Sequence, residues 1–399
     1  MSGNGKPLDI FQDSTKTTIS GRNPEGNFGI VNPPVYHAST ILYPDAAALE
    51  AHDQKYSYGR RGTPTIDALE DAITQIGGGY GTRLTPSGLA AISTALLSFA
   101  EAGDHILVTD SVYEPTRKFC DGILKRLGVE TEYYDPLAGA AIAGKLRPNT
   151  RLVFTESPGS QTFEMQDIPA IANAAHEQGV LVFTDNTWAS PLYFKAFDHG
   201  VDVSIQAATK YIVGHSDVMM GSITTTRACW PQLYDSHNAM GQTAGPDDIY
   251  LALRGLRTLD VRLERHMKNA ITIAKWLEKR PEVLQILHPA LPSHPGHNIW
   301  KRDFAGASGL FSLILKPCSK TARNTFLNTL TLFGMGYSWG GFESLVIPFD
   351  PANYRTATQW PSNGQALRFH IGLEAVEDLK ADLSNAFDEM AKTRLSPHP

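Results

Sequence analysis

Three residues whose side chains could act together in chemistry follow apolar segments of the chain. Asp185 ends the segment VLVFTD, Lys210 ends DVSIQAATK, and Tyr113 comes shortly after HILVTD. A neutral lysine amine is a nucleophile that forms Schiff bases with carbonyl groups, while a carboxylate can hold a protonated nitrogen. An aromatic ring can stack on another flat ring. Together the three residue types would suit a flat aldehyde with a basic ring nitrogen.

Pyridoxal 5'-phosphate (PLP) is a cofactor that requires such a set. A lysine Schiff base holds it, and a carboxylate beside its ring nitrogen keeps that nitrogen protonated, which makes the ring a stronger electron sink. Asp185 fits the carboxylate role, Lys210 the Schiff-base role and Tyr113 the stacking role. Burial and a nearby cation would favour the neutral amine that Lys210 needs.

The phosphate of such a cofactor needs hydrogen-bond donors. The segment TPSGLAAIS places Gly88 and Leu89 at the expected start of a helix, where free backbone N–H groups and the helix dipole attract anions. Thr209 offers a hydroxyl beside Lys210. Upstream, KYSYGRRGTPT contributes Tyr58 and Arg60, and a guanidinium can bind a phosphate in bidentate fashion.

Each of these residues also has an ordinary structural explanation. An aspartate at a strand end is often a helix cap or a turn residue, and a single lysine is usually a solvated charge. Tyr113 alone would fit a core or interface position, and Arg60 with Arg61 would fit a surface pair. The spacing alone therefore leaves a PLP site as one hypothesis among several.

The elements that would position these residues alternate along the chain. HILVTD, RLVFTES and VLVFTD are short apolar segments typical of buried strands, and the segments between them have helical periodicity. Buried strands that alternate with helices predict a mostly parallel sheet covered on both faces. Ligands of such sheets bind at the carboxyl ends of the strands, where Tyr113, Asp185 and Lys210 would lie.

The chain is expected to have three parts. Residues 1–60 are irregular, with Pro33 and Pro34 and scattered glycines, and are interpreted as an N-terminal arm over another surface. Residues 61–256 would form the large α/β domain. A long helical stretch from Gly245 would lead into residues 257–399, a smaller α+β domain with strand-like FSLILK, SLVIPF and ALRFHIG and a final amphipathic helix.

Composition narrows the class of protein. The 399 residues include 42% hydrophobic and 19% charged residues, which is typical of a globular protein, and the net charge is −6. No basic block indicates nucleic acid or anionic lipid as a partner, and no apolar run is long enough to cross a bilayer. The N-terminus has no apolar stretch suited to a signal peptide, so a cytoplasmic location is expected. The three cysteines are far apart, which argues against a disulfide framework.

Seven segments, in order along most of the chain, resemble the Cys/Met-metabolism family of PLP-dependent enzymes. They are YGRRGTPT, TPSGLAAI, DSVYEPTR, FTDNTWASP, SIQAATKYIVGHSDVMMG, SWGGFESL and LRFHIGLE. The resemblance implies PLP as cofactor and the type I fold of PLP-dependent transferases. Ala207 stands where many members have serine, so one phosphate hydroxyl would be missing and Thr209 would carry more of the phosphate binding.

The resemblance also implies roles for individual residues. Lys210 would carry the Schiff base, Asp185 would pair with the ring nitrogen, and Tyr113 would stack on the ring. The phosphate would be held by Gly88, Leu89 and Thr209, and by Tyr58 and Arg60 of a neighbouring subunit. Arg368 would bind the substrate α-carboxylate, and Ser338 and Trp339 would line the pocket. A homotetramer of two active dimers would explain an arm that has no core of its own.

Within the family, the segment Ser338-Trp339-Gly340-Gly341 most resembles the bacterial cystathionine β-lyases, because γ-acting members usually have a small or aliphatic residue in place of Trp339. The expected reaction is β-elimination of L-cystathionine to homocysteine, pyruvate and ammonia, a step of methionine biosynthesis. A cystathionine γ-lyase or γ-synthase, or a broader β-lyase acting on cysteine S-conjugates, would share every cofactor residue and remains an alternative.

Two other classes of protein were weighed against the same residues. His288, His294 and His297 in HPALPSHPGHN could support a metal-dependent hydrolase or a metal-binding module, but no H-E-x-x-H motif is present and no acid lies beside them. A nucleotide-binding dehydrogenase is disfavoured because GGGYGT lacks G-x-G-x-x-G spacing and follows a helix. No metal is expected.

Overall fold

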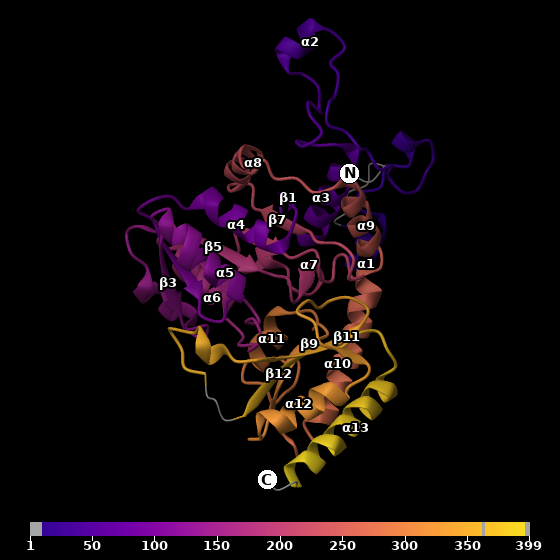
Figure 1. Ribbon diagram of the computed structural model, residues 1–399. Coiled ribbons are helices and arrows are strands. Elements are labelled where there is room, and N and C mark those ends of the chain that lie inside the picture. The colour runs from indigo at the N-terminus through magenta and orange to yellow at the C-terminus, as the bar shows by residue number, and fades with distance from the viewer. Residues whose placement is uncertain (1–9, 361–363, 396–399) are drawn as a thin grey trace.

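The computed structural model describes residues 10–360 and 364–395, and it contains two β-sheets joined by a long helix (Figure 1). The seven-stranded sheet has the order β1-β7-β6-β5-β4-β2-β3, and the five-stranded sheet has the order β10-β11-β12-β9-β8. Every described helix of 18 or more residues is too polar to cross a membrane.

Strands β2 to β6 of the larger sheet are parallel, while β7 runs antiparallel to both of its neighbours. This confirms the expected mostly parallel sheet. The strands are β1 (Gly81–Thr85), β2 (His105–Thr109), β3 (Glu130–Tyr134), β4 (Thr150–Glu156), β5 (Leu181–Asp185), β6 (Val203–Gln206) and β7 (Gly221–Thr225).

Apolar side chains on both faces of the strands explain why this sheet is covered on both sides. Because successive side chains point to opposite faces, Ile106 and Val108 join one core, while Leu107 between them joins another. The first core includes α4 (Gly88–Phe99) and α8 (Trp230–Ala239), and the second includes α6 (Ile168–His176).

Polar residues start several of these helices. Thr63, Ser87 and Asp167 each accept a hydrogen bond from a backbone N–H in the first turn of α3, α4 and α6. Gly78, at φ +77°, ends α3 in the left-handed conformation that glycine adopts without strain. The remaining helices around this sheet are α3 (Pro64–Gly77), α5 (Glu114–Phe119), which continues into a π-helical turn, and α7 (Ser190–Tyr193).

The long helical stretch after Gly245 is two helices and not one. The backbone leaves the helical path at Thr258, between α9 (Pro246–Leu256) and α10 (Leu259–Leu277). Helix α10 then packs on the smaller sheet through Ile273 and Leu277. The bounds of 61–256 and 257–399 for the two domains stay a prediction, although this break in the helix lies close to their junction.

The smaller sheet forms a separate core together with α10 and two later helices. Its strands are β8 (Val283–Leu287), β9 (Leu310–Leu315), β10 (Phe333–Gly334), β11 (Ser344–Phe349) and β12 (Gln365–His370). The two later helices of this core are α12 (Lys320–Thr329) and α13 (Val376–Leu395), whereas α11 (His297–Asp303) packs against the core of the larger sheet that contains Leu107. The strands expected at FSLILK, SLVIPF and ALRFHIG are therefore present as β9, β11 and β12.

A buried carboxylate ties the two parts of the chain together. Asp110, directly after β2, accepts hydrogen bonds from the backbone N–H groups of residues 356, 357 and 358 and from the Thr358 hydroxyl. Arg117 donates to the same side chain at 2.6 Å. These contacts hold the pKa of Asp110 below its ordinary value despite its burial. Residues 356–358, which follow β11, are thereby fixed against the carboxyl edge of the larger sheet.

The described part of the N-terminal arm contains two short helices. Helix α1 (Asp13–Ile19) packs on α3 and α10, whereas α2 (Ala46–Ala51) stands away from the body of the chain (Figure 1). Several apolar side chains of the arm are exposed, among them Phe28 at 98% and Leu42 at 83%. The described part of the arm therefore has little core of its own.

Candidate active site

Lys210 lies in the turn after β6, at the carboxyl edge of the larger sheet. Its ammonium nitrogen donates a hydrogen bond to Ser338 Oγ at 2.9 Å and lies 5.3 Å from the centre of the Trp339 ring. Ser338 and Trp339 come from the segment between β10 and β11 of the smaller sheet. The structure thus brings the lysine and the two predicted pocket residues together.

The surroundings of Lys210 favour a neutral amine. Burial lowers its pKa from 10.5 to about 8, and the nearby positive charge of Arg368 adds to the effect. The carboxylate of Asp185 acts in the opposite direction. An amine with this pKa exists partly as the free base near neutral pH, which is the form required of a nucleophile or a general base.

Asp185 is the last residue of β5, next to β6 in the sheet. Its Oδ1 accepts hydrogen bonds from Thr187, at 3.0 Å from the backbone N–H and 2.5 Å from the hydroxyl. No described residue donates a hydrogen bond to Oδ2. Burial raises the pKa of Asp185, so an ionised carboxylate here would gain from a cationic partner. A protonated ring nitrogen at Oδ2 would be such a partner.

Glu156 is a residue of this site that the sequence analysis did not identify. It ends β4 and is paired with Asp185 across the parallel strands, and its Oε2 accepts a hydrogen bond of 2.7 Å from the backbone N–H of Tyr113. Burial, followed by the charge of Asp185, raises the pKa of Glu156 well above its ordinary value. Glu156 therefore fixes the backbone of Tyr113 beside Asp185. The strand-end argument that identified Asp185 would have identified Glu156 too.

Tyr113 is half-exposed at the start of α5. Burial raises the pKa of its phenol, and the charge of Asp185 is the next cause, so the hydroxyl keeps its proton at neutral pH. The positive charge of Arg368 also acts on this phenol. Tyr113 therefore lies close enough to Asp185 and Arg368 to be influenced by both charges.

The start of α4, where an anion site is expected, has backbone N–H groups that the described residues leave unpaired. The backbone N–H groups of Gly88 and Leu89 have no acceptor among the described residues, while Ser87 Oγ caps Ala90. A Cβ on Gly88 would lie 2.5 Å from Ala207 Cβ, so only glycine allows the helix to approach the segment that leads to Lys210. A phosphate at this end would lie near the N–H groups of the first helical turn.

Thr209 lies in the same region, but its hydroxyl is already engaged. It donates to the carbonyl oxygen of Met220 at 3.1 Å and accepts from the N–H of the same residue at 2.8 Å. A hydroxyl has a single proton to donate. Phosphate binding by Thr209 would therefore require its hydroxyl proton to turn away from Met220.

Arg368 in β12 is buried and has no carboxylate partner among the described residues. Its Nη2 donates to the carbonyl oxygens of residues 336, 337 and 338, whereas its buried Nε has no hydrogen-bond partner. Burial lowers the pKa of Arg368 to about 10. A buried guanidinium with an unused donor is suited to bind a carboxylate that comes from outside the chain.

Tyr58 and Arg60 are not brought to this site within their own chain. They lie at the base of the arm, where Arg60 donates a hydrogen bond of 2.9 Å to the backbone oxygen of Asn238 in α8. Tyr58 is half-exposed and pairs with Thr40 through a single β-bridge. Their predicted contact with a phosphate would thus have to be made in another subunit.

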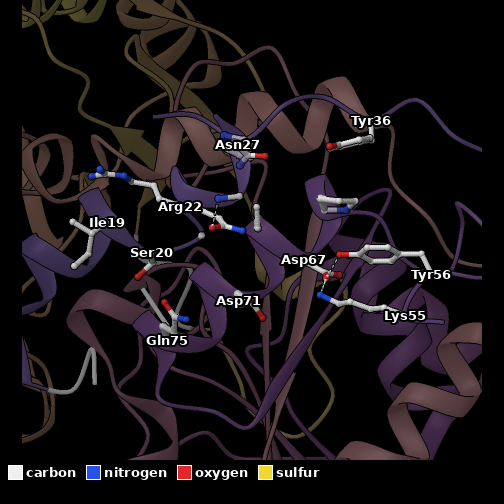
Figure 2. Close-up of a pocket in the computed structure, with 16 residues that line it drawn as sticks. Ile19, Ser20, Arg22, Asn27, Tyr36, Lys55, Tyr56, Asp67, Asp71 and Gln75 are labelled. Carbon is white, nitrogen blue, oxygen red and sulfur yellow. Dashed lines mark hydrogen bonds and ion pairs between the residues drawn. The ribbon is translucent and has the colours of Figure 1, made fainter. Parts of the chain in front are cut away.

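A pocket of about 390 Å³ lies elsewhere, between the arm and α3. Figure 2 shows Lys55 and Tyr56 directed toward Asp67 at its edge, and Asp67 accepts hydrogen bonds from both. None of the residues predicted for the cofactor or substrate lines this pocket.

The three histidines of the rival metal hypothesis each have a backbone contact. Nδ1 atoms of His288 and His294 accept hydrogen bonds from backbone N–H groups two residues ahead, and His297 contacts the carbonyl oxygen of Pro289. Within residues 10–360 and 364–395, no three His, Cys, Asp or Glu side chains are grouped so that they could hold a metal ion.

The residues around Lys210 fit PLP chemically. Lys210 offers an amine of lowered pKa for the aldehyde, and Asp185 offers a free carboxylate oxygen for the ring nitrogen. Gly88 and Leu89 offer unused N–H groups for the phosphate. The orphaned donor of Arg368 completes the set with a position for a substrate carboxylate.

Comparison with known proteins is consistent with this chemistry. Residues 14–388 match the family model described as Cys/Met metabolism PLP-dependent enzyme. A Rhizobium johnstonii protein, provisionally named a cystathionine β-lyase, is 54% identical over 94% of this chain and 95% of its own. Cystathionine β-lyase MetC of Escherichia coli is 44% identical over 94% of this chain and 97% of its own.

Relatives with other names are also similar over nearly their full length. A Wolbachia pipientis protein named L-alanine/L-glutamate racemase is 41% identical over 92% of this chain and 94% of its own. The solved structure of metB from Corynebacterium glutamicum has a TM-score of 0.89 at 30% identity, covering 96% of this chain and 99% of that one.

Proposed function

Because the chain belongs to the Cys/Met metabolism family of PLP-dependent enzymes, we propose that it is a carbon–sulfur lyase that acts on L-cystathionine. The reaction is β-elimination, in which cystathionine and water give homocysteine, pyruvate and ammonia. The observation that carries the proposal is the position of the Lys210 amine, 2.9 Å from Ser338 Oγ and under the opposing influence of Asp185 and Arg368.

When bound, PLP supplies an aldehyde that condenses with amines and a ring that accepts the electron pair left at the substrate Cα. Asp185 would keep the ring nitrogen protonated through its free Oδ2, and Thr187 holds Asp185 in place. Gly88 and Leu89 would bind the phosphate, together with Thr209 once its hydroxyl proton turns away from Met220, and Tyr113 would stack on the ring. The lowered pKa of Lys210 would leave part of its amine neutral near neutral pH, and the neutral amine would remove the Cα proton.

Arg368 binds the α-carboxylate through donors that no described side chain uses. Because the carboxylate is fixed on the smaller sheet and Lys210 on the larger one, the Cα–H bond is held toward the amine, which is catalysis by positioning. The Cβ–S bond then breaks, and its electron pair leaves on sulfur. The ammonium of Lys210 would pass the proton that it took from Cα to that thiolate, or the phenol of Tyr113 would donate its own proton and later regain one from Lys210. The three-carbon enamine product hydrolyses to pyruvate and ammonia.

The active assembly in this proposal is a homotetramer of two dimers. The exposed Phe28 and Leu42 of the arm need a surface to cover them, and Tyr58 and Arg60 lie away from the Lys210 site of their own chain. An arm exchanged between two subunits would satisfy both observations. The proposal also includes a cytoplasmic location and a role in methionine biosynthesis.

The discriminating experiment is product analysis with L-cystathionine on the purified, PLP-loaded protein. β-Elimination releases pyruvate and homocysteine, whereas γ-elimination releases 2-oxobutyrate and cysteine. We expect pyruvate as the main keto acid, because Trp339, whose ring centre lies 5.3 Å from the Lys210 amine, stands where γ-acting members of the family usually have a small or aliphatic residue. A main product of 2-oxobutyrate would assign the chain to the γ-acting members, and the absence of any keto acid would refute the lyase proposal.

A further inference from the structure

His370 lies next to the substrate-binding side of the site and has no role in the proposed reaction so far. It is the last residue of β12 and is fully buried. Arg368 precedes it by two positions in the same strand, so the two side chains point to the same face of the sheet. That face carries the segment between β10 and β11, which includes Ser338, Trp339 and Gly340.

Both ring nitrogens of His370 form hydrogen bonds with the backbone of this segment, at Gly340 and at Glu343. Nδ1 lies 3.0 Å from the carbonyl oxygen of Glu343, and a carbonyl can only accept, so Nδ1 carries the proton. Nε2 is therefore the acceptor of the 3.1 Å hydrogen bond from the Gly340 backbone N–H. Only the neutral ring with its proton on Nδ1 makes both bonds.

The Gly340 backbone is the point where the segment meets Lys210. A Cβ on Gly340 would lie 2.9 Å from the Cα of Lys210, and Gly340 has φ +88°, a conformation that glycine adopts without strain. The two residues before Gly340 are those that contact the Lys210 amine. A displacement of Gly340 would therefore move Ser338 and Trp339 away from that amine.

The segment is held from β12 at two points. Arg368 donates to the carbonyl oxygens of residues 336, 337 and 338, and His370 accepts from the N–H of Gly340. A third contact, from Ser216 Oγ to the Glu343 carboxylate at 2.7 Å, attaches the end of the segment to the larger domain. His370 thus restrains the part of the segment closest to Lys210.

We infer that His370 is a positioning residue, which acts through Gly340 to hold Ser338 and Trp339 against the catalytic amine. This inference rests on the proposed function for the step that it positions. The groups facing His370 come from each element around it: Arg368 in β12, His266 in α10, Lys210 and Tyr211 after β6, and the Glu343 carbonyl.

We expect His370 to stay neutral while it holds Gly340 in place. Burial, followed by the neighbouring His266, lowers the pKa of His370 well below its ordinary value. Arg368 and Lys210 act in the same direction, whereas the hydrogen bond to the Glu343 carbonyl opposes them. The role is therefore a fixed restraint and not a proton transfer.

Two substitutions of His370 test its hydrogen bonds to Gly340 and to Glu343 one at a time. His370→Gln keeps an acceptor at the position of Nε2, whereas His370→Asn keeps only a donor at the position of Nδ1. His266→Asn is the matched control, because His266 is also fully buried, its ring centre lies 5.1 Å from that of His370, and its Nδ1 contacts the carbonyl oxygen of Ile371 and not the segment.

The first measurement is hydrogen exchange of the 336–342 peptide by mass spectrometry on PLP-loaded protein. His370→Asn should speed exchange of the Gly340 amide by about tenfold, the equivalent of one hydrogen bond. His370→Gln and His266→Asn should leave it close to wild type. The second measurement is steady-state turnover, where His370→Asn should lower kcat by about tenfold or more with a smaller change in KM. His370→Gln should recover most of the loss.

Unchanged exchange and unchanged kcat in a folded His370→Asn protein would overturn the inference. An equal effect in His266→Asn would do the same, because it would show general loosening of the core. If His370→Asn does not fold, a failure of His370→Gln to outperform His370→Leu in kcat and in Gly340 protection would refute it. Wild-type protein that forms no keto acid would instead refute the proposed function, while the exchange result would still test the restraint.

Discussion

The unused donors of Arg368 allow a quantitative prediction. Arg368→Ala removes the guanidinium that would bind the substrate α-carboxylate. A hydrogen bond to a charged group contributes about 1.5–3 kcal/mol, and about 1.4 kcal/mol corresponds to a tenfold change in affinity. KM for L-cystathionine should therefore rise by roughly 10- to 100-fold, with a smaller change in kcat.

Two comparisons make this test specific. Arg368→Lys keeps the charge but not the planar pair of donors, so its KM should lie between those of wild type and Arg368→Ala. The analogue of cystathionine that lacks the carboxylate of its cysteinyl half should lose much less affinity than cystathionine in Arg368→Ala, because it lacks the group that Arg368 contacts. A loss confined to kcat, or an analogue that loses affinity in Arg368→Ala as cystathionine does, would show that the carboxylate is bound elsewhere.

Three other predictions concern the cofactor and the assembly. Lys210→Ala should lose both turnover and the visible absorbance of covalently held PLP, and retained lyase activity would refute the assignment of the amine. Asp185→Ala should still bind PLP but lose most of its rate, because the ring becomes a weaker electron sink; equal turnover would refute the ring-nitrogen role, and PLP uptake is the control. Mixing inactive Lys210→Ala with an inactive Arg60→Ala variant should restore part of the activity. Some mixed dimers then contain one intact site, with Lys210 from the Arg60→Ala subunit and Arg60 from the Lys210→Ala subunit. No recovery after verified subunit exchange would argue against a shared site.

The sequence was sufficient to predict the residues that follow strong apolar strands. This argument selected Asp185, Lys210 and Tyr113, and in the structure the charge of Asp185 acts on both of the other side chains. Strands β1 and β3 were missed because their sequences are polar. In β1, Arg83 is buried against Glu70 at 3.1 Å, and β3 lies at the edge of the sheet. Such pairing depends on residues distant in sequence, which local patterns do not reveal.

The other half of the site could not be derived from local patterns. Ser338 meets Lys210 across 128 positions of the chain, and only the resemblance to a family indicated the pairing. The break at Thr258 was missed because it contains neither proline nor glycine and the apolar periodicity continues across it. His370 lay inside a quoted segment, but nothing in LRFHIGLE shows that its ring would reach the Gly340 backbone.

The carboxylate of Asp110 has a consequence for how the sequence of this protein can change. Three of its partners are backbone N–H groups, which every residue except proline provides. Residues 356 and 357 are therefore free to vary during evolution without weakening those bonds. Asp110 itself has no such freedom, because no exchange of side chains in the loop could compensate for its loss. Homologues should accordingly retain an aspartate at position 110 while the residues at positions 356 and 357 differ among them.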